Sequence, residues 1–78
     1  MEATSFKYEI VEPIAILSQS GNVSKELNKV SYNGAPAKYD LRSWRRENGT
    51  EKLLKGLTLT DEEVKILHIA LSELSEGD

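Results

Sequence analysis

The period of the hydrophobic pattern changes once along this chain, at Thr60, and that change limits the possible folds more than any other feature. Before Thr60, apolar and polar residues alternate in short runs, as they do in half-buried β-strands. After Thr60, apolar residues recur at helical spacing as far as Gly77. Strands followed by a helix, without any strand–helix–strand repeat, predict an antiparallel sheet and one C-terminal helix.

Turn residues divide the first part of the chain into four predicted strands. The strands are expected at residues 6–18, 25–32, 38–44 and 52–59. Asn33-Gly34 and Asn48-Gly49 are strong turn signals between them. Because Pro13 cannot donate a ladder hydrogen bond, we expect a bend, a bulge or an edge position in the first strand. The predicted fold class is α+β, with a curved four-stranded antiparallel β-sheet followed by one C-terminal α-helix, in a dimer.

The predicted helix begins with a capping box. The Thr60 hydroxyl can accept from the Glu63 amide while the Glu63 side chain reaches back to the Thr60 amide. The acidic first turn, Asp61 to Glu63, also suits the positive end of the helix dipole. These acids are therefore explained by the helix start and are not candidates for acid–base catalysis.

The apolar side of this helix is wider than a single contact requires. Six apolar residues cover roughly 160° of its circumference, and one sheet face would bury a narrower stripe. Either the helix sinks deep against a curved sheet, or part of its apolar side meets a second copy of the chain. We favour the second copy. The predicted dimer interface consists of Val64, Leu67, Ala70, Leu71 and Leu74.

Length and composition place the chain in a narrow class. Its 78 residues form one small domain, residues 1–78, for which oligomerisation is a common source of stability. It has no cysteine, which excludes disulfides and thiolate metal sites. No apolar run is long enough to span a membrane, and the first residues lack the features of a secretion signal. We expect a bacterial cytoplasmic protein, with association with the nucleoid as an option.

Charge is unevenly distributed along the chain. Residues 25–56 carry eight of the ten lysines and arginines against four acids, a net charge of +4. Residues 57–78 carry one lysine against six acids, a net charge of −5. This asymmetry predicts a polyanion site in the middle of the chain and a different role for the acidic end.

The third predicted strand is the strongest candidate for that site. One of its faces carries Lys38, Asp40, Arg42 and Trp44. The other carries Tyr39, Leu41, Ser43 and Arg45. If Tyr39 and Leu41 are the core pair, the first face lies outward and presents cations beside an exposed indole. Single-stranded nucleic acid is bound in this way, by phosphate neutralisation and base stacking. The alternative is a solvated strand face with Trp44 folded over the rim of the sheet.

Neighbouring strands extend this candidate surface. Tyr32, Lys52 and Lys55 can lie beside the third strand. Lys25 and Lys29 are further candidates for phosphate contacts, although the register of their strand is open. If Leu27 points inward then Lys29 does too, and Val30 and Tyr32 point outward, whereas a bulge would reverse this.

The sequence contains no recognisable catalytic constellation. His68 is the only histidine and lies beside the apolar stripe of the helix, where a packing or surface role is expected. Nothing pairs with it at the spacing of metal ligands, and no glycine-rich phosphate loop or serine nucleophile motif is present. We therefore predict a non-enzyme with no cofactor, no metal, no catalytic residue, no small-molecule substrate and no membrane partner.

Two blocks of this sequence resemble a known family. The segment Tyr39-Asp40-Leu41-Arg42-Ser43-Trp44, followed after a turn by Lys55-Gly56-Leu57-Thr58-Leu59 and an acidic-capped helix, resembles the positive-cofactor-four family of single-stranded-DNA-binding transcriptional coactivators. Residues 25–33, Lys-Glu-Leu-Asn-Lys-Val-Ser-Tyr-Asn, are similar to a block of its short bacterial YdbC-like branch. The resemblance runs from about residue 7 to residue 74.

The resemblance implies a sheet packed on a C-terminal helix, a homodimer made largely through the helices, and basic grooves for single-stranded DNA. It implies that Arg42 contacts DNA, that Trp44 fills the aromatic position after it, and that Tyr32 stacks on a base. Lys55 precedes the glycine of the last strand. The chain departs from the pattern at Leu53-Leu54 and lacks the regulatory tail of the eukaryotic members, so coactivator function does not carry over.

We therefore predict binding of single-stranded DNA, with RNA as an open alternative, by a homodimer that assists transcription, replication or repair. The predicted nucleic-acid-binding residues are Lys25, Lys29, Tyr32, Lys38, Arg42, Trp44, Arg45, Lys52 and Lys55. The rival hypothesis is a protein-interaction module that uses the acidic, apolar-faced helix.

Overall fold

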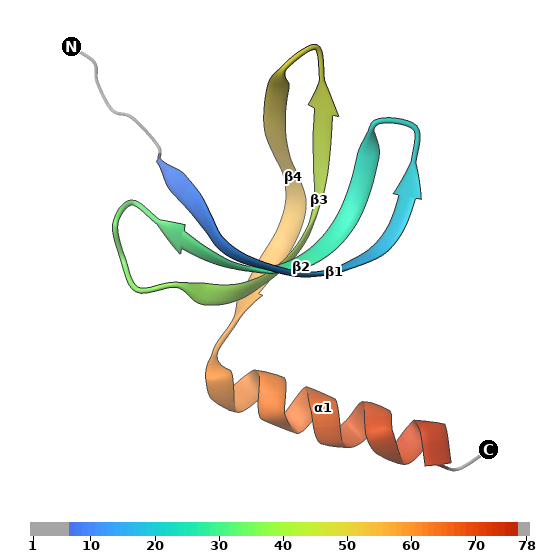
Figure 1. The fold of residues 1–78 in the computed structure, drawn as a ribbon. Coiled ribbons are helices and arrows are strands. Elements are labelled where there is room, and N and C mark those ends of the chain that lie inside the picture. Colours follow the sequence, from blue (N-terminus) through green and yellow to red (C-terminus); the bar gives the residue numbers. More distant parts are fainter. Residues whose placement is uncertain (1–6, 77–78) are drawn as a thin grey trace.

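The computed structural model describes residues 7–76, which form one antiparallel sheet and one helix (Figure 1). The elements are β1 (Tyr8–Ser20), β2 (Val23–Tyr32), β3 (Lys38–Glu47), β4 (Thr50–Leu59) and α1 (Asp61–Glu76). The strand order is β1-β2-β3-β4, so β1 and β4 are the edges. The predicted four-stranded antiparallel sheet followed by a C-terminal helix is confirmed. The predicted strand start at Phe6 and helix end at Gly77 lie outside the described residues.

Two of the predicted turns owe their shape to Asn-Gly pairs. Asn33 and Gly34 have φ of 53° and 78°, and Asn48 and Gly49 have φ of 52° and 73°. This left-handed backbone suits the right-handed twist of hairpin strands, and asparagine and glycine adopt it most readily. The tight second turn lets the strands on either side of it run further than the alternation indicated, to Glu47 and from Thr50.

Strand β1 is bent by three irregularities in its pairing. Its 13 residues pair with the 10 residues of β2, and the register skips Val11, Ile14 and Leu17. Extra residues of this kind bend a strand and increase its twist. The bulge or edge position predicted at Pro13 is therefore confirmed. Beyond Val11 the strand follows a three-residue repeat, which is why simple alternation describes only its beginning.

Residues directly opposite one another in a sheet share a face, so the register defines two faces. We call the first the polar face; its members on the inner strands are Ser24, Glu26, Asn28, Val30, Tyr32, Lys38, Asp40, Arg42, Trp44 and Arg46. We call the second the leucine face; it carries Glu9, Glu12, Ala15, Val23, Lys25, Leu27, Lys29, Tyr39, Leu41, Ser43, Arg45, Glu47, Lys52, Leu57 and Leu59.

The polar face is the concave, buried side of the sheet. The Tyr8 hydroxyl of β1 donates to Glu51 Oε1 of β4 at 2.6 Å, so the two edge strands meet across this face. The Tyr8 and Trp44 rings also approach to 5.6 Å between centroids. Val30 and Trp44 are the buried hydrophobic residues of the described chain. Of the two alternatives left open for residues 25–32, the structure has the one in which Val30 and Tyr32 lie on the enclosed side, because the curvature of the sheet encloses their face.

The capping box of α1 is confirmed. The Thr60 amide donates to Glu63 Oε1 at 2.8 Å, and the Glu63 amide donates to Thr60 Oγ1 at 3.1 Å. This reciprocal pair satisfies two amides that the first helical turn leaves without partners.

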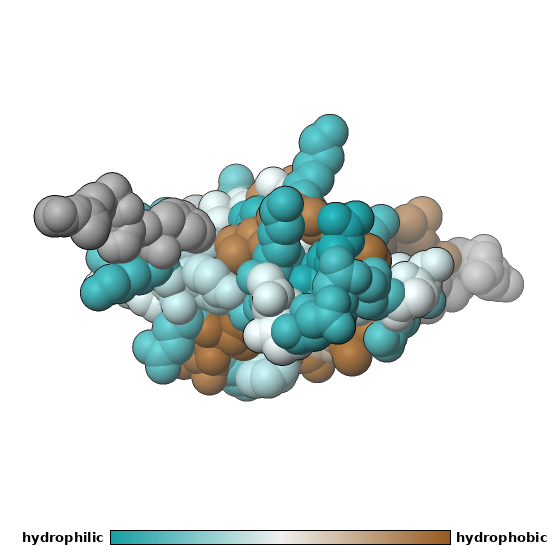
Figure 2. All heavy atoms as spheres, turned by 90° about the horizontal axis from the view of Figure 1, so that it is seen from above, coloured by the Kyte–Doolittle hydropathy of each residue, from teal (hydrophilic) through white to brown (hydrophobic). Residues whose placement is uncertain are grey.

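Helix α1 is set apart from its own sheet (Figure 1). It touches only the two strands β3 and β4, and of the residues 61–74 only Val64 is partly buried. Leu67, Leu71 and Leu74 are 41%, 55% and 70% exposed. The helix is thus not sunk against the sheet of its own chain, contrary to the first of the two interpretations and to the packing that the resemblance implies. In the view from above, hydrophobic residues also reach the molecular surface (brown in Figure 2).

Within residues 7–76, no helix combines the length and the apolar character needed to cross a membrane.

Candidate nucleic-acid interface

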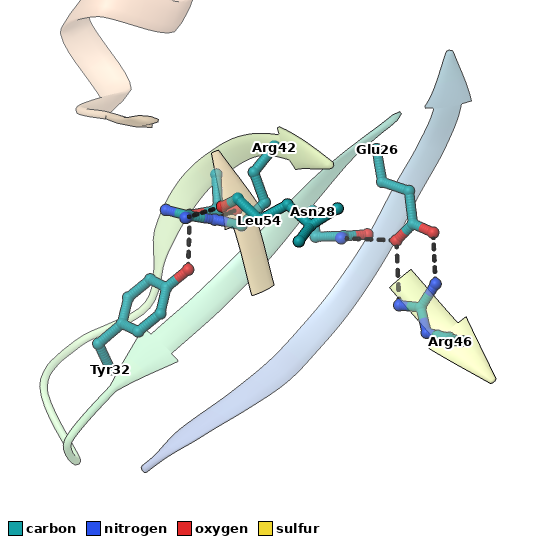
Figure 3. A network of polar contacts seen from close by, with 7 residues as sticks. Glu26, Asn28, Tyr32, Arg42, Arg46 and Leu54 are labelled. Atoms are coloured by element: carbon teal, nitrogen blue, oxygen red, sulfur yellow. Dashed lines mark hydrogen bonds and ion pairs between the residues drawn. The ribbon is translucent and has the colours of Figure 1, made fainter. Parts of the chain in front are cut away.

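Arg42 is held on the polar face by the buried carboxylate of Asp40. Its Nε donates to Oδ1 at 2.8 Å and its Nη2 donates to Oδ2 at 2.9 Å. Tyr32 Oη donates to the same Oδ2 at 2.7 Å, and Arg42 Nη1 donates to the Leu54 carbonyl at 3.1 Å (Figure 3). The Asp40 side chain is 0% exposed and that of Arg42 is 16% exposed. Arg42 is therefore a partly buried ion-pair partner of Asp40.

This arrangement fixes two protonation states. The hydrogen bonds to Asp40 raise the pKa of Arg42 above its ordinary value. Burial, and then the hydrogen bond to Asp40, raise the pKa of the Tyr32 hydroxyl to about 12. Near neutral pH, Arg42 is charged and Tyr32 is a neutral hydrogen-bond donor.

A second buried network is centred on Glu26. Its carboxylate accepts from Arg46 Nη1 at 2.7 Å and from Asn28 Nδ2 at 3.1 Å (Figure 3). It also accepts from the Ser24 hydroxyl. Arg46 Nε also donates to Glu51 Oε2 at 2.6 Å. The hydrogen bond from Arg46, helped by those from Ser24 and Asn28, lowers the pKa of Glu26 to about 2. Glu26 is therefore ionised although its side chain is only 8% exposed.

Trp44 cannot serve as an exposed stacking platform. It is 0% exposed, with the Tyr8 ring on it and the Arg46 guanidinium carbon 5.3 Å from its ring centroid. The alternation along β3 is as predicted, but its polar side faces the concavity and Tyr39 and Leu41 lie on the convex side. The prediction of an outward Arg42 and Trp44 is wrong, because ion pairs allow charged side chains to occupy the enclosed face.

Gly56 explains the glycine of the β4 motif. It lies opposite Arg42 in the register, where a Cβ atom would come within 1.9 Å of Arg42 Cβ and 2.6 Å of the Leu41 carbonyl oxygen. The two backbones approach more closely here than any side chain allows. Gly56 thereby permits the geometry that holds Arg42 on Asp40.

Three predicted cations gather at one end of the leucine face. Lys25 and Arg45 lie on neighbouring strands, and Lys52 is directly opposite Arg45. All three are exposed, and within residues 7–76 none of them makes an ion pair. Arg45 and Lys52 also line a hollow at the β3–β4 hairpin, together with Glu47. We call Lys25, Arg45 and Lys52 the basic end.

The remaining predicted cations lie apart from the basic end. Lys29 is on the leucine face but partly buried, with its ammonium 4.9 Å from the centroid of the Tyr39 ring. Lys38 is exposed at the start of β3, and Lys55 is exposed where the β3–β4 register shifts. The nine predicted residues are thus divided: three form the basic end, four lie on the polar face (Tyr32, Lys38, Arg42 and Trp44), and Lys29 and Lys55 are placed singly.

Sequence reasoning missed the acidic partners and Arg46. The Asp40–Arg42 pair had a usable signal, since two residues two apart on one strand share a face. The Glu26–Arg46 pair had none, because its members are 20 residues apart on different strands. The unpredicted networks decide which arginines are free to bind a ligand.

The described chain offers no obvious metal centre. Within residues 7–76, no three histidine or carboxylate side chains come together in a way that could hold a metal ion. His68 is exposed on α1.

Comparison with known proteins shows a relative similar enough to establish a shared family. No protein-family model matches the chain. A protein of Treponema pallidum (strain Nichols), described as an uncharacterized protein, is 42% identical over 71 residues, which cover 90% of this chain and 81% of that protein. This chain belongs to the same family. The description of the Treponema protein states no ligand or reaction.

Proposed function

We propose that this protein binds single-stranded nucleic acid, DNA in the first instance, through the basic end of a homodimer. The observation that carries the proposal is the division between paired and unpaired cations. Lys25, Arg45 and Lys52 are exposed and make no ion pair within residues 7–76. Arg42 and Arg46 would have to give up carboxylate partners before they could take a phosphate.

Binding of this kind contacts the sugar–phosphate backbone of the nucleic acid and not its bases. Lysine and arginine neutralise phosphates and carry no sequence information, so sequence preference should be weak. Trp44 contributes indirectly, by filling the concave side behind the basic strands. The resemblance to the positive-cofactor-four family, carried by residues 25–33, 39–44 and 55–59, supports a single-stranded ligand.

The homodimer is supported by the poor burial of a single chain. Two hydrophobic residues are buried in the described part, whereas ten large ones are exposed. An isolated helix of the length of α1 is marginal in water and needs packing to persist. The predicted interface residues Val64, Leu67, Ala70, Leu71 and Leu74 lie on the side of α1 that a second copy would cover.

Fluorescence anisotropy with a labelled single-stranded oligonucleotide, its matching duplex and several salt concentrations tests the proposal. The triple variant Lys25→Gln, Arg45→Gln, Lys52→Gln should bind weakly, and its log–log salt slope should be smaller by about 2, from about 0.7 for each lost phosphate contact. The matched control is Lys38→Gln, Lys55→Gln, Lys65→Gln, which removes the same charge from exposed positions elsewhere. Equal losses in both triple variants, or no binding by the unaltered chain at low salt, would contradict the proposal.

The exposed apolar side of α1 also favours the rival function, a protein-interaction module. In that case the chain would show no salt-dependent nucleic-acid binding, and its apolar helix residues would remain uncovered until a different protein was added. Light scattering on the pure chain separates the two: a dimer supports covering by a second copy, and a monomer favours the rival.

A further inference from the structure

The two Asn-Gly turns of the sheet have the same backbone shape but different surroundings. All four of their residues have positive φ, between 52° and 78°. The Asn33-Gly34 turn joins β2 to β3 and the Asn48-Gly49 turn joins β3 to β4, so the turns lie at opposite ends of the sheet (Figure 1). The Asn48-Gly49 turn is at the same end as Arg45 and Lys52 of the basic end.

An asparagine followed by glycine can lose its side-chain amide without an enzyme. The glycine nitrogen, once it has lost its proton, attacks Cγ of the asparagine, and the new C–N bond closes a succinimide ring while the side-chain nitrogen leaves as ammonia. Water then opens the ring to an aspartate or an isoaspartate, each with one negative charge. Glycine favours this attack because it has no Cβ atom to hinder the approach, and asparagine is accordingly a thermolabile residue.

The Asn33 turn is tied down by hydrogen bonds. Asn33 Oδ1 accepts from the Lys7 amide at 2.9 Å, and the Asn33 amide donates to the Lys7 carbonyl at 2.8 Å. The Ala35 amide donates to the Tyr32 carbonyl at 3.0 Å, and the Ser31 hydroxyl donates to the Ala35 carbonyl at 2.6 Å. Rotation of the Asn33 side chain towards the next backbone nitrogen would break some of these bonds, so the reaction is opposed here.

The Asn48 side chain has no such tether. It is exposed, and within residues 7–76 it makes no hydrogen bond. A Cβ atom added to Gly49 would meet nothing within 4 Å; the same holds for Gly34, so the tether is the difference between the turns. Behind the Asn48 turn, the Arg46–Glu51 ion pair holds the two strands together. The turn can therefore open locally, and bring the Gly49 nitrogen to Cγ, without unfolding of the sheet.

We infer that Asn48 is a modification site, at which loss of the side-chain amide lowers the affinity of the basic end for nucleic acid. This inference rests on the proposed function and adds a regulation of the same site. Asn48 lines the hollow at the β3–β4 hairpin together with Arg45, Lys52, Glu47 and Thr50. Two cations against Glu47 give these residues a net charge of +1, and a carboxylate at position 48 reduces it to zero.

The added charge acts on binding in one direction. A carboxylate in the hollow competes with phosphate for Arg45 and Lys52, as a new negative charge beside a cation cluster does in general. Because ammonia is lost, the change does not reverse by itself and accumulates with the age of the molecule. Older copies of the chain therefore bind nucleic acid more weakly than new ones.

Mass spectrometry of the aged protein tests the modification itself. The unaltered chain is incubated in neutral and in mildly alkaline buffer and then digested with trypsin at mildly acidic pH, so that digestion adds no deamidation. Cleavage after lysine and arginine puts Asn48 in the peptide 47–52 and Asn33 in the peptide 30–38. We expect the first peptide to exchange its amide for a carboxyl several times faster than the second, and faster at the higher pH. Equal rates in the two peptides, or an unchanged Asn48, would overturn the inference.

Two aspartate variants of equal charge test the consequence for binding. Asn48→Asp places the carboxylate in the hollow, and Asn33→Asp places one at the other end of the sheet, where its oxygen can still accept from the Lys7 amide. Anisotropy with single-stranded DNA at 0.15 M salt should show about fourfold weaker binding for Asn48→Asp, the loss of one phosphate contact, and little change for Asn33→Asp. Circular dichroism establishes that both variants fold.

The outcomes separate this inference from the proposed function. If both variants bind as tightly as the unaltered chain, or lose affinity equally, the regulation is refuted while the binding of single-stranded DNA stands. If the unaltered chain does not bind at low salt, the proposed function fails and the regulation fails with it. The peptide masses decide the chemistry at Asn48 in either case, because they are measured without nucleic acid.

Discussion

The two faces of the sheet are completed in opposite ways. The polar face is charged and yet buried, and its partners all come from the same chain: Asp40 has Arg42 and Tyr32, and Glu26 has Arg46. The leucine face is apolar in its middle and yet uncovered by its own helix. Polarity alone therefore does not tell which side of a strand is enclosed; curvature and available partners decide.

The energetics of the two faces differ in the same way. A buried carboxylate is stable only if several donors replace its lost water. Asp40 accepts from Arg42 and Tyr32, and Glu26 accepts from three side chains. An exposed leucine needs no hydrogen-bond donors, but covering it is favourable by about 25 cal/mol for each Å² of apolar surface removed from water. Both buried carboxylates of the polar face thus have their partners within the chain, although the buried Trp44 Nε1 has no hydrogen-bond partner among the described residues. The leucine face is open to a partner.

The largest effect is expected where the polar face depends on backbone approach. Gly56→Ala places a Cβ atom 1.9 Å from Arg42 Cβ, so β3 and β4 must separate and the Asp40 network must break. We expect a loss of about 4–5 kcal/mol in the free energy of unfolding. Urea unfolding followed by circular dichroism at fixed protein concentration measures it. Thr58→Ala, exposed on the same strand, is the control; equal stability of the two variants would refute the close approach.

A smaller loss of stability is expected when the large side chain on the concave side of the sheet is removed. Trp44→Ala removes the largest fully buried side chain, and such substitutions cost about 3 kcal/mol or more. Val11→Ala, at a bulge where the side chain is 53% exposed, should change the free energy of unfolding by less than about 1 kcal/mol. Thermal and urea unfolding of both variants provide the comparison. If Trp44 were an exposed stacking residue, its removal would affect DNA binding more than stability.

Acidification should weaken the polar face through Glu26. Its pKa is about 2, against an ordinary 4.5, so the folded state favours the ionised form. This stabilisation is complete above about pH 5 and is lost as the pH falls towards 2. Melting temperatures between pH 7 and pH 2 should fall for the unaltered chain, and Glu26→Gln should be less stable at pH 7 by about 1–3 kcal/mol and flatter with pH. If the melting temperature of Glu26→Gln fell with pH as steeply as that of the unaltered chain, Glu26 would not be the group that causes the loss of stability in acid.

The smallest effect belongs to a single cation of the leucine face. Lys25→Gln should lower the affinity for single-stranded DNA about fourfold at 0.15 M salt, which follows from a slope of about 0.7 for one phosphate. Its stability should not change, since Lys25 is exposed and makes no ion pair within residues 7–76. Lys65→Gln on α1 is the control. Anisotropy and urea unfolding on the same samples separate binding from folding.

The sequence predicts the features that local chemistry determines. The Asn-Gly turns need left-handed backbone, and the pair Thr60 and Glu63 satisfies helix amides by itself. The exposure of Lys25, Arg45 and Lys52 also agrees with their position in a basic segment. These features are determined by residues that are close together in the sequence, so a pattern of a few residues predicts them.

The sequence does not predict which side of β3 is enclosed. That outcome depends on the curvature of β1, where Val11, Ile14 and Leu17 are extra residues in the register. It also depends on the Glu26–Arg46 pair, which joins different strands. Tyr39 and Leu41 look like a core pair because they are apolar, but the concave side is closed by ion pairs. For this reason the alternation of β3 by itself puts Trp44 on the wrong side of the sheet.

The central claim is that nucleic acid binds the basic end and leaves the polar face unchanged. Nuclear magnetic resonance tests it in one titration, because Trp44 is the only tryptophan and its indole N–H gives one resolvable signal. With single-stranded DNA added to the labelled protein, we predict shifts of the Lys25, Arg45 and Lys52 amides and an indole signal that stays in place. A large indole shift with silent amides at those positions would put the ligand on the polar face and contradict the account.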